Sequence, residues 1–125
     1  MTGVSKIPHD CPTPDKVREA LARLVASEEF RASPQLVRFL RFVAEAALDG
    51  NAARITSYAI GVDALARGAA FDPQGDPIVR VEATRLRRAI ERYYAGSGAG
   101  DLVLIQLPRG SYVPSFAFRA RAGSA

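Results

Sequence analysis

The sequence contains few of the residues that carry catalysis or bind metals. Its 125 residues include one cysteine, Cys11, one histidine, His9, and no tryptophan. A single cysteine excludes an internal disulfide, and His9 and Cys11 together supply fewer ligands than a zinc site needs. A Ser/His/Asp triad is not expected, because the only histidine lies near the N-terminus. We therefore expect a protein that is not an enzyme and that holds no metal or other cofactor.

Long apolar stretches are also absent. No run approaches the roughly 18 to 20 apolar residues of a membrane-spanning helix. The N-terminal segment "MTGVSKIPHDCPTPD" lacks the apolar core of a secretory signal. These absences, with the single cysteine, predict a cytoplasmic protein without a membrane partner. The glycine-rich residues 96–100 lack the Lys-Ser/Thr of a phosphate-binding loop, so no small-molecule ligand is evident.

Negative charge is scarce in the C-terminal part of the chain. Residues 1–76 contain nine Lys or Arg and ten Asp or Glu, whereas residues 77–125 contain eight Arg and three acidic residues. The second segment therefore accounts for the whole net charge of +4. A basic surface attracts polyanions and releases their counterions, so nucleic acid is the first partner to consider.

Start and stop signals divide the chain into four helices and a hairpin. Helix-capping and first-turn residues stand at Thr13-Pro14, Ser33-Pro34, Thr56-Ser57 and Asp76-Pro77. Apolar residues at helical spacing follow each of them, which predicts helices at 14–30, 34–49, 57–67 and 77–95. The β-favouring stretches "DLVLIQL" and "YVPSFAF" on either side of "PRGS" predict a hairpin over 102–118.

This order predicts one mainly α domain (α+β) over residues 13–118, with disordered tails at 1–12 and 119–125. Helices followed by a hairpin form the layout of a winged helix-turn-helix, here with two extra N-terminal helices. The helices at 57–67 and 77–95 are then the helix-turn-helix pair, and the hairpin is the wing.

The helix predicted at 77–95 carries five arginines and is amphipathic. At about 100° per residue, a narrow sector expected to face the core contains Val79, Ala83, Leu86, Ile90 and Tyr93. The opposite sector faces solvent, and an α-helix of this kind fits the major groove of B-DNA.

Base reading is predicted for Arg85, Thr84 and Val81 in the solvent sector. Arginine pairs with guanine O6 and N7, threonine offers a hydroxyl and a methyl group, and valine can contact a thymine methyl. The other cations are expected to hold phosphates, together with the residues of the wing turn. The predicted phosphate contacts are Arg80, Arg87, Arg88, Arg92, Arg109 and Ser111.

The stretch "VRVEATRLRRAI", followed at hairpin distance by "IQLPRGSYV", resembles the OmpR/PhoB-type winged helix over about residues 56–116. That resemblance implies that Arg85, before the central Leu86, looks toward the bases and that Arg87 holds a phosphate. The wing turn "RGSY" is one residue shorter than in that family, and two helices replace its N-terminal sheet. The layout is still closer to a helical winged-helix module at the front of larger bacterial proteins with TPR or cyclase-like domains, which implies a bacterial origin.

These patterns predict a sequence-specific duplex DNA-binding protein of the bacterial cytoplasm, associated with the nucleoid, that regulates transcription. A homodimer or tandem copies on DNA are expected, since one module makes few contacts. The alternative is a protein-interaction adaptor that has a winged-helix fold and does not bind DNA. A plain solvated helix face, with an Arg87–Glu91 ion pair, is the simplest reading of the arginines.

Overall fold

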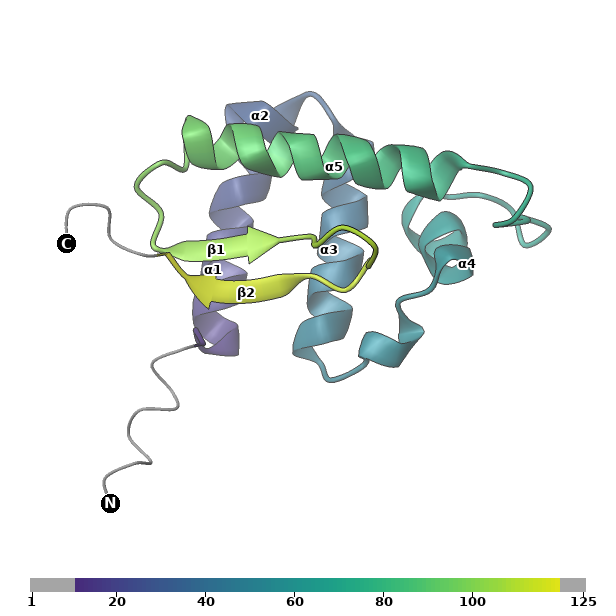
Figure 1. Ribbon diagram of the computed structural model, residues 1–125, viewed down its shortest axis with the longest axis horizontal. Helices are drawn as coiled ribbons and strands as arrows, with labels where there is room; N and C mark the ends of the chain where they lie inside the picture. Colours follow the sequence, from purple (N-terminus) through teal and green to yellow (C-terminus); the bar gives the residue numbers. More distant parts are fainter. Residues whose placement is uncertain (1–10, 120–125) are drawn as a thin grey trace, which may run out of the picture.

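A computed structural model describes residues 11–119 and confirms a mainly α fold with a C-terminal antiparallel hairpin. In chain order the elements are α1 (Pro14–Val25), α2 (Glu28–Arg31), α3 (Pro34–Leu48), the 3₁₀ turn η2 (Ala52–Arg54), α4 (Ser57–Ala59), the π turn η3 (Ile60–Ala64), α5 (Ile78–Ala95), β1 (Val103–Gln106) and β2 (Ser115–Phe118). Helix α5 lies across α1 and α3, and the hairpin runs alongside α5 (Figure 1). None of the helices in the described part is long and apolar enough to cross a membrane.

Three of the predicted helix starts are capped by side chains. The Thr13 hydroxyl accepts a hydrogen bond from the Lys16 amide at 3.3 Å, and Thr56 accepts one from the Ala59 amide at 3.1 Å. The Asp76 carboxylate accepts one from the Ile78 amide at 3.0 Å. Helix α5 begins at Ile78, one residue after the predicted position, and Pro77 is the residue at its N-terminal boundary.

The prediction of one continuous helix over 14–30 is wrong, because the chain turns at residues 26–27 between α1 and α2. The Ser27 hydroxyl donates to the Leu24 carbonyl at 2.6 Å, and the Ser27 amide donates to the same oxygen at 3.1 Å. These local bonds replace helical ones and end α1. The turn lets α2 bury Phe30 completely.

The helix predicted over 57–67 is also wrong in its extent. After one α-helical turn the chain widens into η3, where the Leu65 amide donates to the Ile60 carbonyl at 3.0 Å, and Ala66 then adopts a φ of 60°. The Phe71 ring lies against Gly61, and a Cβ at that glycine would stand 2.3 Å from a ring carbon. The phenyl group thus takes the space of a side chain there, which only glycine permits.

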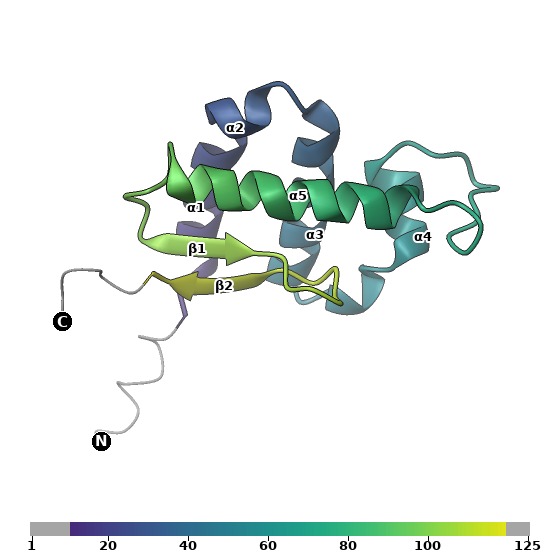
Figure 2. The ribbon, with the colours of Figure 1, turned by 45° about the horizontal axis from the view of Figure 1, so that its top comes forward.

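The core forms where α5 crosses the N-terminal helices (Figure 2). The predicted inward sector of α5 is confirmed, since each of its members is at most 4% exposed: Val79, Ala83, Leu86, Ile90 and Tyr93. From the other elements the largest fully buried side chains are Phe30, Phe39, Leu24, Leu40, Ile60 and Ile105. This packing fixes the rotation of α5 and so decides which residues face outward.

The hairpin predicted over 102–118 is present, with Val103 opposite Phe118 and Gln106 opposite Ser115. An eight-residue connection, 107–114, joins the strands, with Gly110 at a φ of +80°. The free edge of β1 lies against α5, where the buried Tyr94 hydroxyl donates to the Val103 carbonyl at 2.9 Å and accepts from the Ile105 amide at 2.7 Å. Burial raises the pKa of Tyr94 to about 12.

Asp101 links three elements at the open end of the hairpin. Its carboxylate accepts two hydrogen bonds from Arg23, at 3.0 and 3.1 Å, one from the Tyr93 hydroxyl and one from the Val103 amide. Burial acts to raise the pKa of Asp101, but the hydrogen bonds from Arg23, Val103 and Tyr93 outweigh it, and the pKa is lowered.

The predicted tails meet the described region at two points. Pro12 is buried, and Arg119 donates to the carbonyls of Tyr94, Gly98 and Ala99. The expectation that both residues belong to disordered tails is therefore wrong, since Pro12 packs into the fold and Arg119 bonds one carbonyl of α5 and two of the turn that follows it. His9 and the remaining tail residues, 1–10 and 120–125, lie outside the described residues.

Candidate nucleic-acid interface

Seven residues of α5 form what we call its outward face. All are exposed in the structure: Arg80, Val81, Thr84, Arg85, Arg88, Glu91 and Arg92. Four of them are arginines and one is a glutamate, so the face is strongly basic. Helix α5 thus has the two-sided character that the sequence predicts, with its inward sector buried and four of its arginines exposed.

The three predicted base-reading residues lie together on the N-terminal half of this face. Val81 is 47% exposed, so its methyl groups are open to solvent. The Thr84 hydroxyl donates to the Arg80 carbonyl at 3.2 Å, which leaves its methyl group and oxygen lone pairs at the surface. The Arg85 side chain is 65% exposed, and its Nη1 lies 3.6 Å from a carboxylate oxygen of Glu82.

Arg87 connects α5 to the hairpin instead of pointing freely into solvent. Its Nε donates to the Leu107 carbonyl at 3.0 Å, and its Nη2 donates to the carbonyls of Pro108 at 3.2 Å and Ser111 at 3.0 Å. The Arg87–Glu91 ion pair of the plain surface reading is not formed. The phosphate contact predicted for Arg87 stays a prediction. Because Nε and Nη2 are already bonded, only Nη1 could contact a phosphate without breaking these hydrogen bonds.

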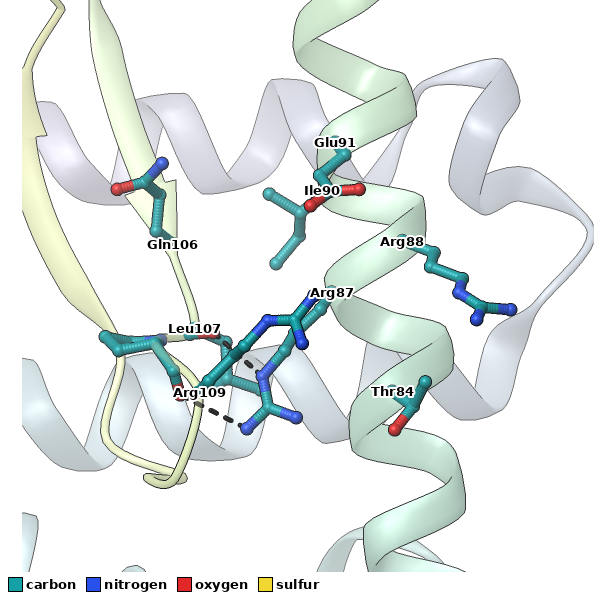
Figure 3. A pocket seen from close by; sticks show the side chains of 9 residues that line it. Thr84, Arg87, Arg88, Ile90, Glu91, Gln106, Leu107 and Arg109 are labelled. Atoms are coloured by element: carbon teal, nitrogen blue, oxygen red, sulfur yellow. Dashed lines mark hydrogen bonds between the residues drawn. The ribbon is translucent and has the colours of Figure 1, made fainter.

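A cleft of about 410 Å³ lies between α5 and the hairpin connection. It is lined by Thr84, Arg87, Arg88, Ile90, Glu91, Gln106, Leu107, Pro108 and Arg109. Figure 3 shows Arg109 extending from the connection toward α5, while Arg88 projects from the helix on the side away from the strands. The cleft itself thus contains the guanidinium groups of Arg109 and of Arg87, and Arg87 is bonded to the connection.

Ser111 is half-buried in the hairpin connection, two residues after Arg109. Its hydroxyl accepts a hydrogen bond from the Val113 amide at 3.0 Å, and its carbonyl accepts one from Arg87. Both hydrogen bonds lie within the hairpin connection or join it to α5. The phosphate contacts predicted for Ser111, Arg80, Arg92 and Arg109 stay predictions.

Sequence reasoning missed three residues that shape this region. Gln106 lines the cleft, Glu82 pairs with Arg85, and Arg119 bonds the end of α5. The i,i+3 spacing of Glu82 and Arg85 was a visible signal for their pairing. Gln106 could have been found from its alternation with the inward Ile105 and Leu107, whereas nothing in the sequence pointed to Arg119.

No group of metal-binding side chains occurs within residues 11–119. Comparison of the chain with protein-family models, with curated proteins and with solved structures found no match.

Proposed function

We propose that this chain binds duplex DNA as a winged helix-turn-helix, with α5 in the major groove and the hairpin as its wing. The observation that carries the proposal is the outward face of α5, which exposes four arginines beside a cleft into which Arg109 extends from the hairpin connection. In this proposal α3, the α4–η3 segment and α5 are the helical core of the motif, and α1 and α2 are additions.

The size and chemistry of α5 suit a major groove. An α-helix with its side chains is about 10–12 Å wide, and the groove of B-DNA is about 12 Å wide. Arg85 would pair with a guanine, while Thr84 and Val81 would contact the neighbouring base edges. All three lie in the N-terminal half of α5, the part of a recognition helix that reaches the bases.

The remaining cations would hold the sugar–phosphate backbone. Arg88 and Arg109 flank the cleft between helix and wing, which has room for a phosphate group and its sugar. Arg80 and Arg92 lie at the two ends of the outward face and would contact phosphates on either side of the groove. Arg87 would hold the hairpin connection against α5 and so keep the distance between the helix and the connection fixed.

Such a protein would act as a bacterial transcriptional regulator in the cytoplasm, at the nucleoid. Specific sites are usually bound with nanomolar or tighter affinity, and a single small module buries too little surface for that. We therefore expect a homodimer or tandem copies on adjacent half-sites.

The proposal is tested by fluorescence anisotropy with a pool of mixed genomic duplexes at two salt concentrations. With Arg80, Arg88, Arg92 and Arg109 on phosphates, the slope of log K against log salt should be about −3.6, at about −0.9 per contact. The variant Arg85→Ala with Arg88→Ala should bind weakly and lose about 0.9 from that slope.

The matched control is Arg41→Ala with Arg54→Ala, which removes the same charge. Both arginines are exposed, and they line a different groove that contains no residue of α5 or the hairpin. Equal losses in the two double variants would show attraction by net charge alone. Wild-type protein without salt-dependent DNA affinity would favour the protein-interaction adaptor.

A further inference from the structure

Glu82 is a buried glutamate on the helix that carries the outward face. The residue is 5% exposed, although the neighbouring Val81 is 47% exposed. Burying a carboxylate is costly unless opposite charge or hydrogen bonds compensate for it. A glutamate in this position therefore needs a partner close by.

Among residues 11–119 the structure gives this carboxylate a single partner, Arg85. The Glu82 Oε2 lies 3.6 Å from Arg85 Nη1, and the carboxylate takes part in no hydrogen bond. Asp101, by comparison, accepts four hydrogen bonds at the other end of α5. Arg85 is thus the one cation of the described residues that pairs with Glu82.

The pairing leaves one edge of the Arg85 guanidinium open. The contact with Glu82 is made by Nη1, and Nε and Nη2 make no hydrogen bond within the described residues. Two adjacent N–H donors on one planar edge match the spacing of guanine O6 and N7. The pair is also asymmetric, with an Arg85 side chain that is 65% exposed and a Glu82 side chain that is 7% exposed.

We propose that Glu82 is a positioning residue for base recognition, which holds Arg85 so that its Nε–Nη2 edge faces a guanine. This inference rests on the proposed DNA binding and deepens it. A long arginine side chain loses much rotamer freedom when it pairs with a base. Glu82 removes part of that loss before DNA arrives, and its negative charge repels phosphates that would otherwise capture Arg85. Its effect is therefore on the choice of base more than on overall affinity.

The test compares wild type with Glu82→Gln, Arg85→Ala and the double variant. Wild-type protein first selects its preferred duplex from a random pool. Binding is then measured to that duplex, to the same duplex with each guanine in turn replaced by 7-deazaguanine, and to a scrambled duplex. The 7-deazaguanine lacks the N7 acceptor and identifies the base that Arg85 reads.

We expect Glu82→Gln to lower the preference for the selected duplex over the 7-deazaguanine duplex by about threefold to tenfold. Affinity for the scrambled duplex should stay the same or rise, because a negative charge has been removed. In the Arg85→Ala background, Glu82→Gln should change the preference no further.

The inference is overturned if Glu82→Gln weakens binding to all duplexes equally, which would indicate a structural role for Glu82. It is also overturned if Arg85→Ala abolishes the preference while Glu82→Gln keeps it, in which case the proposed function still stands. A wild-type protein that binds no duplex removes the proposed function and this inference together.

Discussion

Replacement of Arg87 by alanine tests whether this side chain fixes the hairpin connection to α5. The substitution removes all three hydrogen bonds that the guanidinium donates to carbonyls of residues 107, 108 and 111. Outside the two strands, the connection has few other bonds to hold its shape. We expect the connection to loosen while the strands and α5 remain folded.

The magnitude follows from the kind of bond and its exposure. A hydrogen bond from a charged donor contributes about 1.5–3 kcal/mol when it is well shielded. Arg87 is half-buried, and water can reach the freed carbonyls, so we expect the three bonds together to contribute about 2 kcal/mol. For a domain of this size that corresponds to a fall in Tm of about 8 °C.

Thermal unfolding followed by circular dichroism measures this loss, and the matched control is Arg88→Ala. Arg88 is the next residue, carries the same charge and is exposed, and the structure gives it no hydrogen bond within residues 11–119. Its replacement should change stability by less than about 0.5 kcal/mol. Equal Tm values for the two variants would refute the idea that Arg87 fixes the hairpin connection.

Two further predictions concern the end of α5 and the open end of the hairpin. The lowered pKa of Asp101 means that its carboxylate stabilises the fold above its unfolded pKa of about 3.9, and that this contribution disappears as the pH falls through the folded value. Asp101→Asn should therefore lower the Tm at pH 7 and lose less further Tm on acidification to pH 3 than wild type. Asp63→Asn, at an exposed carboxylate, is the control, and parallel pH curves for wild type and Asp101→Asn would contradict the prediction. A Cβ at Gly98 would stand 2.1 Å from the Tyr93 ring, whereas one at Gly100 would meet nothing within 4 Å. Gly98→Ala should cost about 1–3 kcal/mol in urea unfolding and Gly100→Ala close to none, and similar midpoints would show that the ring can move aside.

The amphipathic character of α5 could be predicted because helical periodicity depends only on spacing along the chain. Val79, Leu86 and Ile90 recur at helical intervals, and the structure buries all three. The buried sector is nevertheless wider than predicted, since it includes Glu82 and Tyr94. Helix α5 packs against the hairpin and the N-terminal helices, and a count of apolar residues cannot show that this packing buries a glutamate.

The breaks in the helices and the role of Arg87 could not be predicted for a different reason. The turn at Ser27 depends on a hydroxyl that bonds a carbonyl three residues back, and serine is compatible with a helix as well as with a turn. Arg87 binds carbonyls that lie 20 to 24 residues further along the chain. Such contacts depend on how the hairpin packs, so the sequence shows the arginine but not whether its partner is a protein carbonyl or a phosphate.

The Tyr94 hydroxyl takes the place of a neighbouring strand along β1. A two-stranded ribbon normally has two edges at which another chain could add a strand. Here the phenol hydroxyl occupies one acceptor and one donor of the β1 edge, the Val103 carbonyl and the Ile105 amide, so in the described part of the chain the outer side of β2 is the more open edge for another peptide. Strand addition on the β1 side would have to displace the Tyr94 hydroxyl first, which disfavours growth of this sheet into a fibre.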